Sequence, residues 1–190
     1  MSFPDTKNIW RSYVPFFTTG RFRKVGKGFT QHCGPTAVSN CVWAYARRYG
    51  FTDVINLGPE EVFRRVAGIG ARRLIFWNMD GPLFLGGTSD FLVPWYIHAA
   101  FDSFSLPRPK IAARKTAKPV YIIESLKKGA LIYLELRRHP RYGNHHLIMI
   151  GVREDAAGNP VFSAADGWKS AEVLLTPSDL KHAYYFEVLP

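Results

Sequence analysis

The sequence predicts an α+β fold, in which helices precede an antiparallel sheet. Apolar residues recur at helical spacing between residues 34 and 49. After residue 130 the chain instead consists of short β-branched or aromatic runs separated by turns. Residues 155–159 are a hairpin signal between two of these runs. Because 190 residues fit one domain with a substantial core, residues 1–190 are predicted to form a single domain.

Local signals predict the individual elements in order. The first 30 residues (1–30) lack a clear period and predict an irregular arm. Gly50 supplies a C-terminal stop for the first helix, and Pro59 with the two glutamates that follow opens the second. Thr88 or Ser89 is the expected N-cap of the third helix. The predicted helices are 34–49, 59–67, 88–101 and 119–128, and the predicted strands are 130–136, 145–152, 160–165, 171–175 and 184–189.

Composition bears on the expected location. Apolar residues make up 47% of the chain and charged residues 21%, which is typical of globular proteins. No apolar run approaches the roughly 20 residues needed to span a bilayer, so no transmembrane segment is expected. Residues 1–5 lack the basic region and apolar stretch of a secretory signal, so the expected location is the cytoplasm.

The net charge of +10 comes from lysines and arginines spread along the whole chain, often in pairs. This balance favours either an anionic partner or a solvated basic surface. No recognised nucleic-acid-binding motif accompanies the basic pairs, so nucleic acid is not the expected partner. A non-catalytic basic binding module remains an alternative to an enzyme.

Two cysteines, Cys33 and Cys41, belong to the first predicted helix. Their separation corresponds to about 12 Å along the helix axis, which exceeds disulfide reach, so both thiols are predicted to be reduced. Cys41 shares the apolar stripe of the helix and is expected to be a buried structural thiol. Cys33 comes at the helix start between polar neighbours, where unpaired N–H groups and the helix dipole stabilise a thiolate. Cys33 is therefore the candidate nucleophile.

Two later segments hold candidate partners for Cys33. His145 and His146 enter a predicted strand, and because strand side chains alternate, only one of them can meet the thiol directly. Asp166 ends the next strand, and the predicted hairpin brings it towards the histidines. Symmetric pairing about Gly158 leaves it a few residues short of His145, unless a bulge shifts the register. A carboxylate there could accept the imidazole N–H and fix the tautomer.

Three segments together resemble a known family. Residues 33–37 (Cys-Gly-Pro-Thr-Ala) are similar to the nucleophile segment of the papain-like peptidases that process double-glycine bacteriocin leaders. His145 and the apolar run to Gly151 look like the papain-type histidine strand, in which the base lies six residues before a glycine. This spacing selects His145 over His146. Residues 166–168 (Asp-Gly-Trp) resemble the papain Asn-Ser-Trp segment, with aspartate in place of asparagine as in the leader-processing group.

The resemblance implies a papain-like fold, with the nucleophile at a helix N-terminus packed on a C-terminal antiparallel sheet. It implies a triad in which Cys33 is the nucleophile, His145 is the general base and Asp166 orients the histidine. Such an enzyme hydrolyses a peptide or isopeptide bond of a peptide or protein substrate through an acyl-enzyme, without a cofactor or metal. Acyl transfer to an amine, or deamidation, would use the same residues. The sequence does not indicate the substrate or the oligomeric state.

One position departs from the family pattern. The relatives carry a glutamine five or six residues before the cysteine, whose amide helps to stabilise the oxyanion. Here the nearby glutamine is Gln31, two residues before Cys33. With a shorter local loop, Gln31 would take this role together with the Cys33 N–H; otherwise its side chain points away. A zinc site that uses His32, Cys33 and the two later histidines is a further alternative, although adjacent strand histidines point apart.

Overall fold

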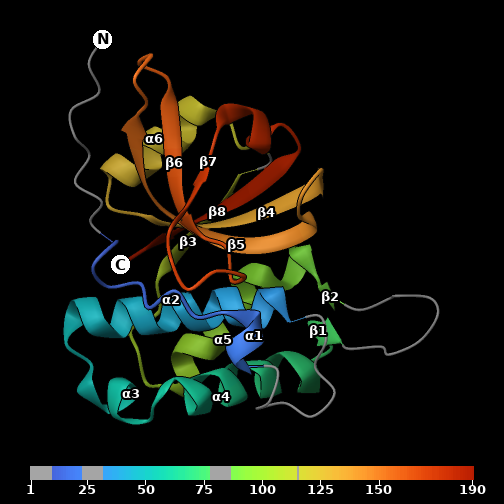
Figure 1. Ribbon diagram of the computed structural model, residues 1–190. Coiled ribbons are helices and arrows are strands. Elements are labelled where there is room, and N and C mark those ends of the chain that lie inside the picture. The colour runs from blue at the N-terminus through green and yellow to red at the C-terminus, as the bar shows by residue number, and fades with distance from the viewer. Residues whose placement is uncertain (1–9, 23–31, 78–86, 115) are drawn as a thin grey trace.

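The structure is a computed structural model that describes residues 10–22, 32–77, 87–114 and 116–190. Helices precede a six-stranded antiparallel sheet (Figure 1), which confirms the predicted α+β class. The helices are α1 (Thr19–Phe22), α2 (Cys33–Tyr49), α3 (Thr52–Asn56), α4 (Pro59–Arg72), α5 (Val93–Ser103) and α6 (Pro119–Lys127), with 3₁₀ turns η1 (Asp90–Leu92) and η2 (Pro177–Leu180). The strands are β1 (Phe76–Trp77), β2 (Gly87–Thr88), β3 (Lys110–Arg114), β4 (Leu131–His139), β5 (Gly143–Glu154), β6 (Pro160–Ala165), β7 (Val173–Leu175) and β8 (Ala183–Leu189).

The helix boundaries follow the sequence signals in two cases out of three. Gly50 ends α2 in the left-handed conformation, with φ 74°, and its N–H bonds to the Ala46 oxygen. Pro59 opens α4 as predicted, and this helix continues beyond its expected end. The third helix starts later than predicted, because Thr88 belongs to β2 and residues 90–92 form a 3₁₀ turn before α5.

The main sheet has the strand order β3-β8-β4-β5-β6-β7, and all neighbouring strands are antiparallel. The four longest strands of this sheet correspond to predicted ones. β3 is not among the predicted strands; it pairs with β8 at one edge of the sheet. Two further short strands, β1 and β2, form a separate two-stranded sheet beside the helices (Figure 1).

The predicted hairpin joins β5 to β6. The Asp155 N–H donates to the Asn159 oxygen across 2.9 Å, and Gly158 adopts a φ of 80° that favours glycine. A register shift between Met149 and Gly151 then brings Ala165 opposite Ile148. The next residue in the chain is Asp166. The pairing of Glu154 with Pro160 centres the hairpin on residue 157 and not on Gly158, and the bulge shifts the register by one more residue. Together they carry the end of β6 closer to the start of β5 than symmetric pairing about Gly158 predicts.

Two apolar layers cover the two faces of the sheet. On one face, buried residues of α2, α4 and α5 pack against Tyr133, Ile148 and Ile150. On the other face, α6 packs against the alternating partners Leu134 and Leu147. Figure 1 shows α2 to α5 grouped below the sheet and α6 on the opposite side. The start of α2 therefore lies against one face of the strand that carries both histidines.

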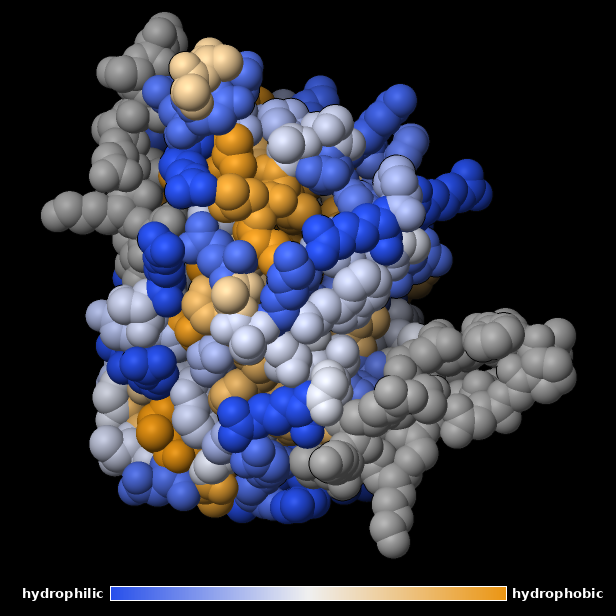
Figure 2. All heavy atoms as spheres, viewed as in Figure 1, coloured by the Kyte–Doolittle hydropathy of each residue, from blue (hydrophilic) through white to orange (hydrophobic). Residues whose placement is uncertain are grey.

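The visible face of the molecule is largely polar. Figure 2 shows hydrophilic side chains over most of the visible face and a hydrophobic strip over the sheet half of the molecule. Within the ranges that the structure describes, no helix combines the length and the apolar character needed to cross a membrane.

Candidate cysteine and histidine site

Cys33 is the first residue of α2 and is partly exposed. The backbone N–H groups of His146, Gly34 and Cys33 itself lie near its sulfur and favour the thiolate. Burial is nevertheless the largest influence and raises the pKa of the Cys33 thiol, while the three N–H groups lower it. The predicted stabilised thiolate is therefore not what this environment produces, because the loss of solvation outweighs the helix N-terminus.

Gly34 allows β2 to pack directly on the first turn of α2. A Cβ atom at Gly34 would lie 1.9 Å from Oγ1 of Thr88, so only glycine fits. Thr88 fills the space beside Gly34. The Thr88 hydroxyl is buried and has no hydrogen-bond partner in the described part of the chain. The segment that follows residue 86 thus forms one wall of the Cys33 site.

His146 is the imidazole on the α2 side of the sheet. It lies on the same face of β5 as Ile148, and its ring is 5.6 Å from that of Tyr133. Burial lowers the pKa of His146 to about 4, although a hydrogen bond to the Thr88 backbone and the charge of Asp90 act in the opposite direction. His146 is therefore a neutral, buried side chain at neutral pH.

His145 is held between two aromatic rings. The Tyr142 ring stacks on the imidazole with a centroid separation of 5.3 Å, and the Trp168 ring lies 4.9 Å away. Burial lowers the pKa of His145, while the backbone and charge of Asp166 raise it. The ring is therefore fixed in position and is largely neutral at pH 7.

The main chain of Asp166 fixes the tautomer of His145. The imidazole Nε2 lies 2.6 Å from the backbone oxygen of Asp166. A carbonyl oxygen only accepts hydrogen bonds, so Nε2 carries the proton and Nδ1 of the neutral ring keeps its lone pair. The structure thus brings His145 and Asp166 together as predicted, but the acceptor is the carbonyl and not the carboxylate.

The Asp166 carboxylate organises the loop instead. It is fully buried; Oδ1 accepts from the N–H groups of Trp168 and Lys169, each at 2.8 Å. Oδ2 accepts from the Tyr142 hydroxyl at 3.0 Å, and burial together with this carboxylate raises the pKa of Tyr142 to about 12. Asp166 therefore positions both the ring that stacks on His145 and the loop that carries Trp168.

This loop also contacts the helix that begins with Cys33. Gly167, with φ 70°, sits where an added Cβ would be 3.4 Å from Cγ2 of Thr36, in the first turn of α2. The Gly167 oxygen accepts a hydrogen bond of 2.6 Å from the Thr19 N–H, so part of the predicted irregular arm supports the loop. The sequence alone gave no sign of this contact.

The contact between Cys33 and the two histidines involves the backbone of β5 and not an imidazole ring. The sulfur of Cys33 lies near the N–H of the peptide that links His145 to His146. In the described residues, no hydrogen bond joins the sulfur to either imidazole ring. The structure therefore brings the three predicted triad residues to one region, with a direct bond between His145 and Asp166 and with the sulfur of Cys33 close to the backbone of His146.

The remaining predicted residues have separate outcomes. Gln31, the predicted oxyanion donor, lies outside the described residues. Cys41 is fully buried in the core under α2, and burial raises the pKa of its thiol. Among the residues that the structure describes, no three histidine, cysteine or acidic side chains are grouped so that they could hold a metal ion.

A partly exposed ionic cluster beside His146, built on the buried carboxylate of Glu135, was not expected from the sequence. Glu135 pairs with His146 across the β4–β5 ladder, and Arg137 joins Glu135 to Asp90. Burial raises the pKa of Glu135 to about 7, and the hydrogen bond from Arg137 acts against this shift. Only the isolated acidic residue within the apolar run 131–136 could have indicated the cluster.

Comparison with known proteins gives no match: no family model matches the chain, and no curated protein is significantly similar to it. The resemblance to the papain-like peptidases thus depends on the three sequence motifs.

Proposed function

We propose that this protein is a thiol-dependent peptidase of the papain-like type, with Cys33 as nucleophile and His145 as general base. One observation carries the proposal: the Asp166 carbonyl holds the proton on Nε2 of His145 and leaves Nδ1 free to accept another. The sulfur of Cys33 lies near the N–H of the peptide immediately after His145. His145 is thus a base of defined tautomer. The ring on the α2 face of β5 is that of His146, whose buried Nδ1 has no partner in the described residues, so His146 is the competing base that the test below separates from His145.

The pKa directions favour a neutral resting pair. The pKa of Cys33 is raised and that of His145 is lowered, in both cases mainly by burial. A thiol and a neutral imidazole are therefore the resting forms, so His145 acts as a general base during attack and not as the partner of a preformed ion pair.

The reaction then follows the chemistry of acyl transfer. Cys33 Sγ attacks the carbonyl carbon of an amide, and its proton passes to Nδ1 of His145. The imidazolium returns this proton to the departing amine as the C–N bond breaks. Water, deprotonated by His145, then cleaves the thioester and regenerates the thiol. The N–H of Cys33 at the start of α2 is a donor for the developing oxyanion, together with the predicted amide of Gln31.

The architecture supports the papain-like assignment in outline. The nucleophile begins a helix that packs on an antiparallel sheet, the base lies near the start of a strand of that sheet, and the third residue follows the next strand. Trp168 against His145 matches the Asp-Gly-Trp motif on which the resemblance rests.

The test uses a mixture of short synthetic peptides incubated with the protein and analysed by mass spectrometry for cleavage products and for a thioester adduct on Cys33. We expect His145→Gln to lower turnover by about 10²–10⁴-fold, as for the loss of a general base. The matched variant His146→Gln should retain turnover within about tenfold, and Cys33→Ala should abolish it. Cleavage that persists in Cys33→Ala, or that is lost in His146→Gln but kept in His145→Gln, would overturn the assignment.

A further inference from the structure

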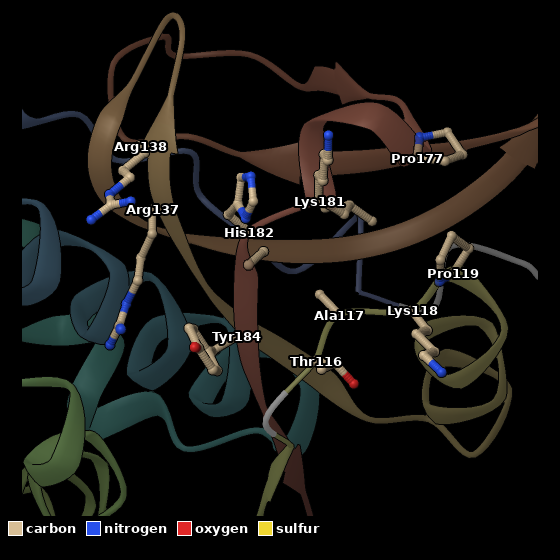
Figure 3. A pocket seen from close by; sticks show the side chains of 12 residues that line it. Thr116, Ala117, Lys118, Pro119, Arg137, Arg138, Pro177, Lys181, His182 and Tyr184 are labelled. Atoms are coloured by element: carbon tan, nitrogen blue, oxygen red, sulfur yellow. The ribbon is translucent and has the colours of Figure 1, made fainter.

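A pocket of about 520 Å³ opens at the end of the sheet where β4 finishes and β8 begins. Figure 3 shows Arg137 and Arg138 on one side, Lys118 and Pro119 on the other, and His182 and Lys181 between them. They come from the last residues of β4, the first residues of β8 with the preceding η2 turn, and the segment that leads into α6. The volume is within the range of small-molecule sites in proteins.

Every charged side chain that lines this pocket is basic. The lining contains no aspartate or glutamate, and its basic members are Lys118, Arg137, Arg138, Lys181 and His182. Arg137 is already paired with two carboxylates, and the Lys118 ammonium lies 5.9 Å from the Tyr121 ring. In the described part of the chain, the side chains of Arg138, Lys181 and His182 have no ion pair. The pocket therefore holds positive charge that nothing in its own lining neutralises.

The backbone of Arg138 adds a second, independent observation. Arg138 has a φ of 50°, in the left-handed region, within the register shift between Leu136 and His139. This conformation is costly for a residue with a side chain, and bulges of this kind redirect side chains near functional sites. The Asn144 side chain stabilises it by accepting the Arg138 N–H across 3.0 Å. A long basic side chain is thus kept at a position where glycine would be less strained.

The N-terminus of α6 adds to the positive electrostatic potential of this pocket. Lys118 and Pro119 both line the pocket, and they are the N-cap and first residue of this nine-residue helix. The positive end of the helix dipole therefore lies at the same region as the basic side chains, although Pro119 has no N–H and the N–H groups of Tyr121 and Ile122 already donate to the Lys118 oxygen.

We propose that this pocket binds an oxyanion group, a carboxylate or a phosphate, and that Arg138 and Lys181 are its principal contacts. Both groups match the donors present: the planar fork of an arginine and an ammonium, with the positive end of the α6 dipole nearby. The site is separate from the chemistry of Cys33 and does not depend on it. The group reaches the pocket either as a free small anion or as part of an acidic peptide segment.

The experiment is a titration of the intact ¹⁵N-labelled protein followed by NMR, with inorganic phosphate, succinate and a tetraglutamate peptide as separate probes. We expect saturable shifts in residues 116–119, 137–138 and 177–184. The double variant Arg138→Glu/Lys181→Glu should bind at least about tenfold more weakly. The control Arg47→Glu/Arg153→Glu changes the same charge at two exposed positions elsewhere and should keep the original affinity. Arg138→Ala/Lys181→Ala repeats the test without introduced acids.

The probes distinguish the two sources of the anion. Saturation by phosphate or succinate identifies a free anion as sufficient, whereas saturation by the peptide alone identifies carboxylates carried on a chain. Shifts spread over the whole basic surface, or equal losses in the pocket and control variants, would overturn the proposal, since they would show only the effect of net charge.

Discussion

The imidazole of His145 donates from Nε2 to the main-chain oxygen of Asp166 across 2.6 Å, while the carboxylate of the same residue bonds elsewhere. One residue thus performs two tasks: its backbone fixes the tautomer and its side chain fixes the loop. This separation matters because a backbone carbonyl cannot be removed by changing the side chain.

The first prediction concerns substitutions at Asp166. In Asp166→Asn, the carbonyl that accepts from His145 remains, so we expect peptidase turnover to fall by less than about tenfold, far less than for loss of the base. Asp166→Ala leaves the Trp168 and Lys169 N–H groups and the Tyr142 hydroxyl without their acceptor, and should lower the free energy of unfolding by about 3 kcal/mol. Urea unfolding measures the second effect. If Asp166→Asn were as inactive as His145→Gln, the carboxylate itself would be the orienting group.

The second prediction concerns alkylation of Cys33. Because burial raises the pKa of this thiol, the rate of its reaction with iodoacetamide should stay low near pH 7 and increase only above pH 9. Peptide mapping by mass spectrometry gives the rate for each cysteine, and Cys41 serves as the buried internal control. Rapid labelling of Cys33 well below pH 8 would instead indicate a preformed thiolate, which the position of Cys33 at a helix start predicts.

The third prediction concerns the dependence of stability on pH. The pKa of His146 is lowered to about 4 in the folded state, so its contribution is present above its unfolded pKa and is lost as the pH falls towards 4. The pKa of Glu135 is raised to about 7, so its contribution is present below its unfolded pKa and is lost as the pH rises through 7. Between about pH 4.5 and 6.5 the two effects oppose each other.

Glu135→Gln removes the carboxyl contribution and leaves that of His146. The free energy of unfolding of this variant should therefore rise with pH between about pH 4.5 and 6.5. His146→Leu removes the histidine contribution and leaves that of the Glu135 carboxyl, so the free energy of unfolding of this variant should fall as the pH rises. Each slope is at most about 1.4 kcal/mol per pH unit. Urea unfolding at several pH values measures both, with the unchanged protein as reference; slopes of the same sign in the two variants would contradict this account.

The fourth prediction concerns the contact between α2 and β2. Gly34→Ala places a methyl group 1.9 Å from Thr88 Oγ1, so we expect a loss of about 1–3 kcal/mol in the free energy of unfolding. Thr88→Gly in the same chain should recover part of this loss by removing the clash. The matched control is Gly68→Ala in α4, where the nearest atom is a flexible arginine end at 3.4 Å, and where alanine should stabilise the helix by up to about 1 kcal/mol. A tolerated Gly34→Ala would mean that β2 does not pack this closely.

Most of the regular structure could be read from local patterns. The period of α2, the stop at Gly50 and the turn at 155–159 depend on neighbours in the chain, so the sequence contains their full cause. Strand β3 could not be found this way. Its residues, Lys110 to Arg114, have weak strand propensity, and they become a strand only because β8 supplies pairing partners at the sheet edge.

The sequence by itself determined which residues carry reactive groups and the order in which they occur: a cysteine at a helix start, two histidines at a strand start and an aspartate after the next strand. Tertiary structure alone decided their surroundings. Burial reversed the expected direction of the Cys33 pKa, the bulge near Ile150 brought the end of β6 closer to His145, and a carbonyl took the place of the predicted carboxylate acceptor. Solvation and hydrogen-bond partners are supplied by residues far apart in the chain, so a local pattern contains no record of them.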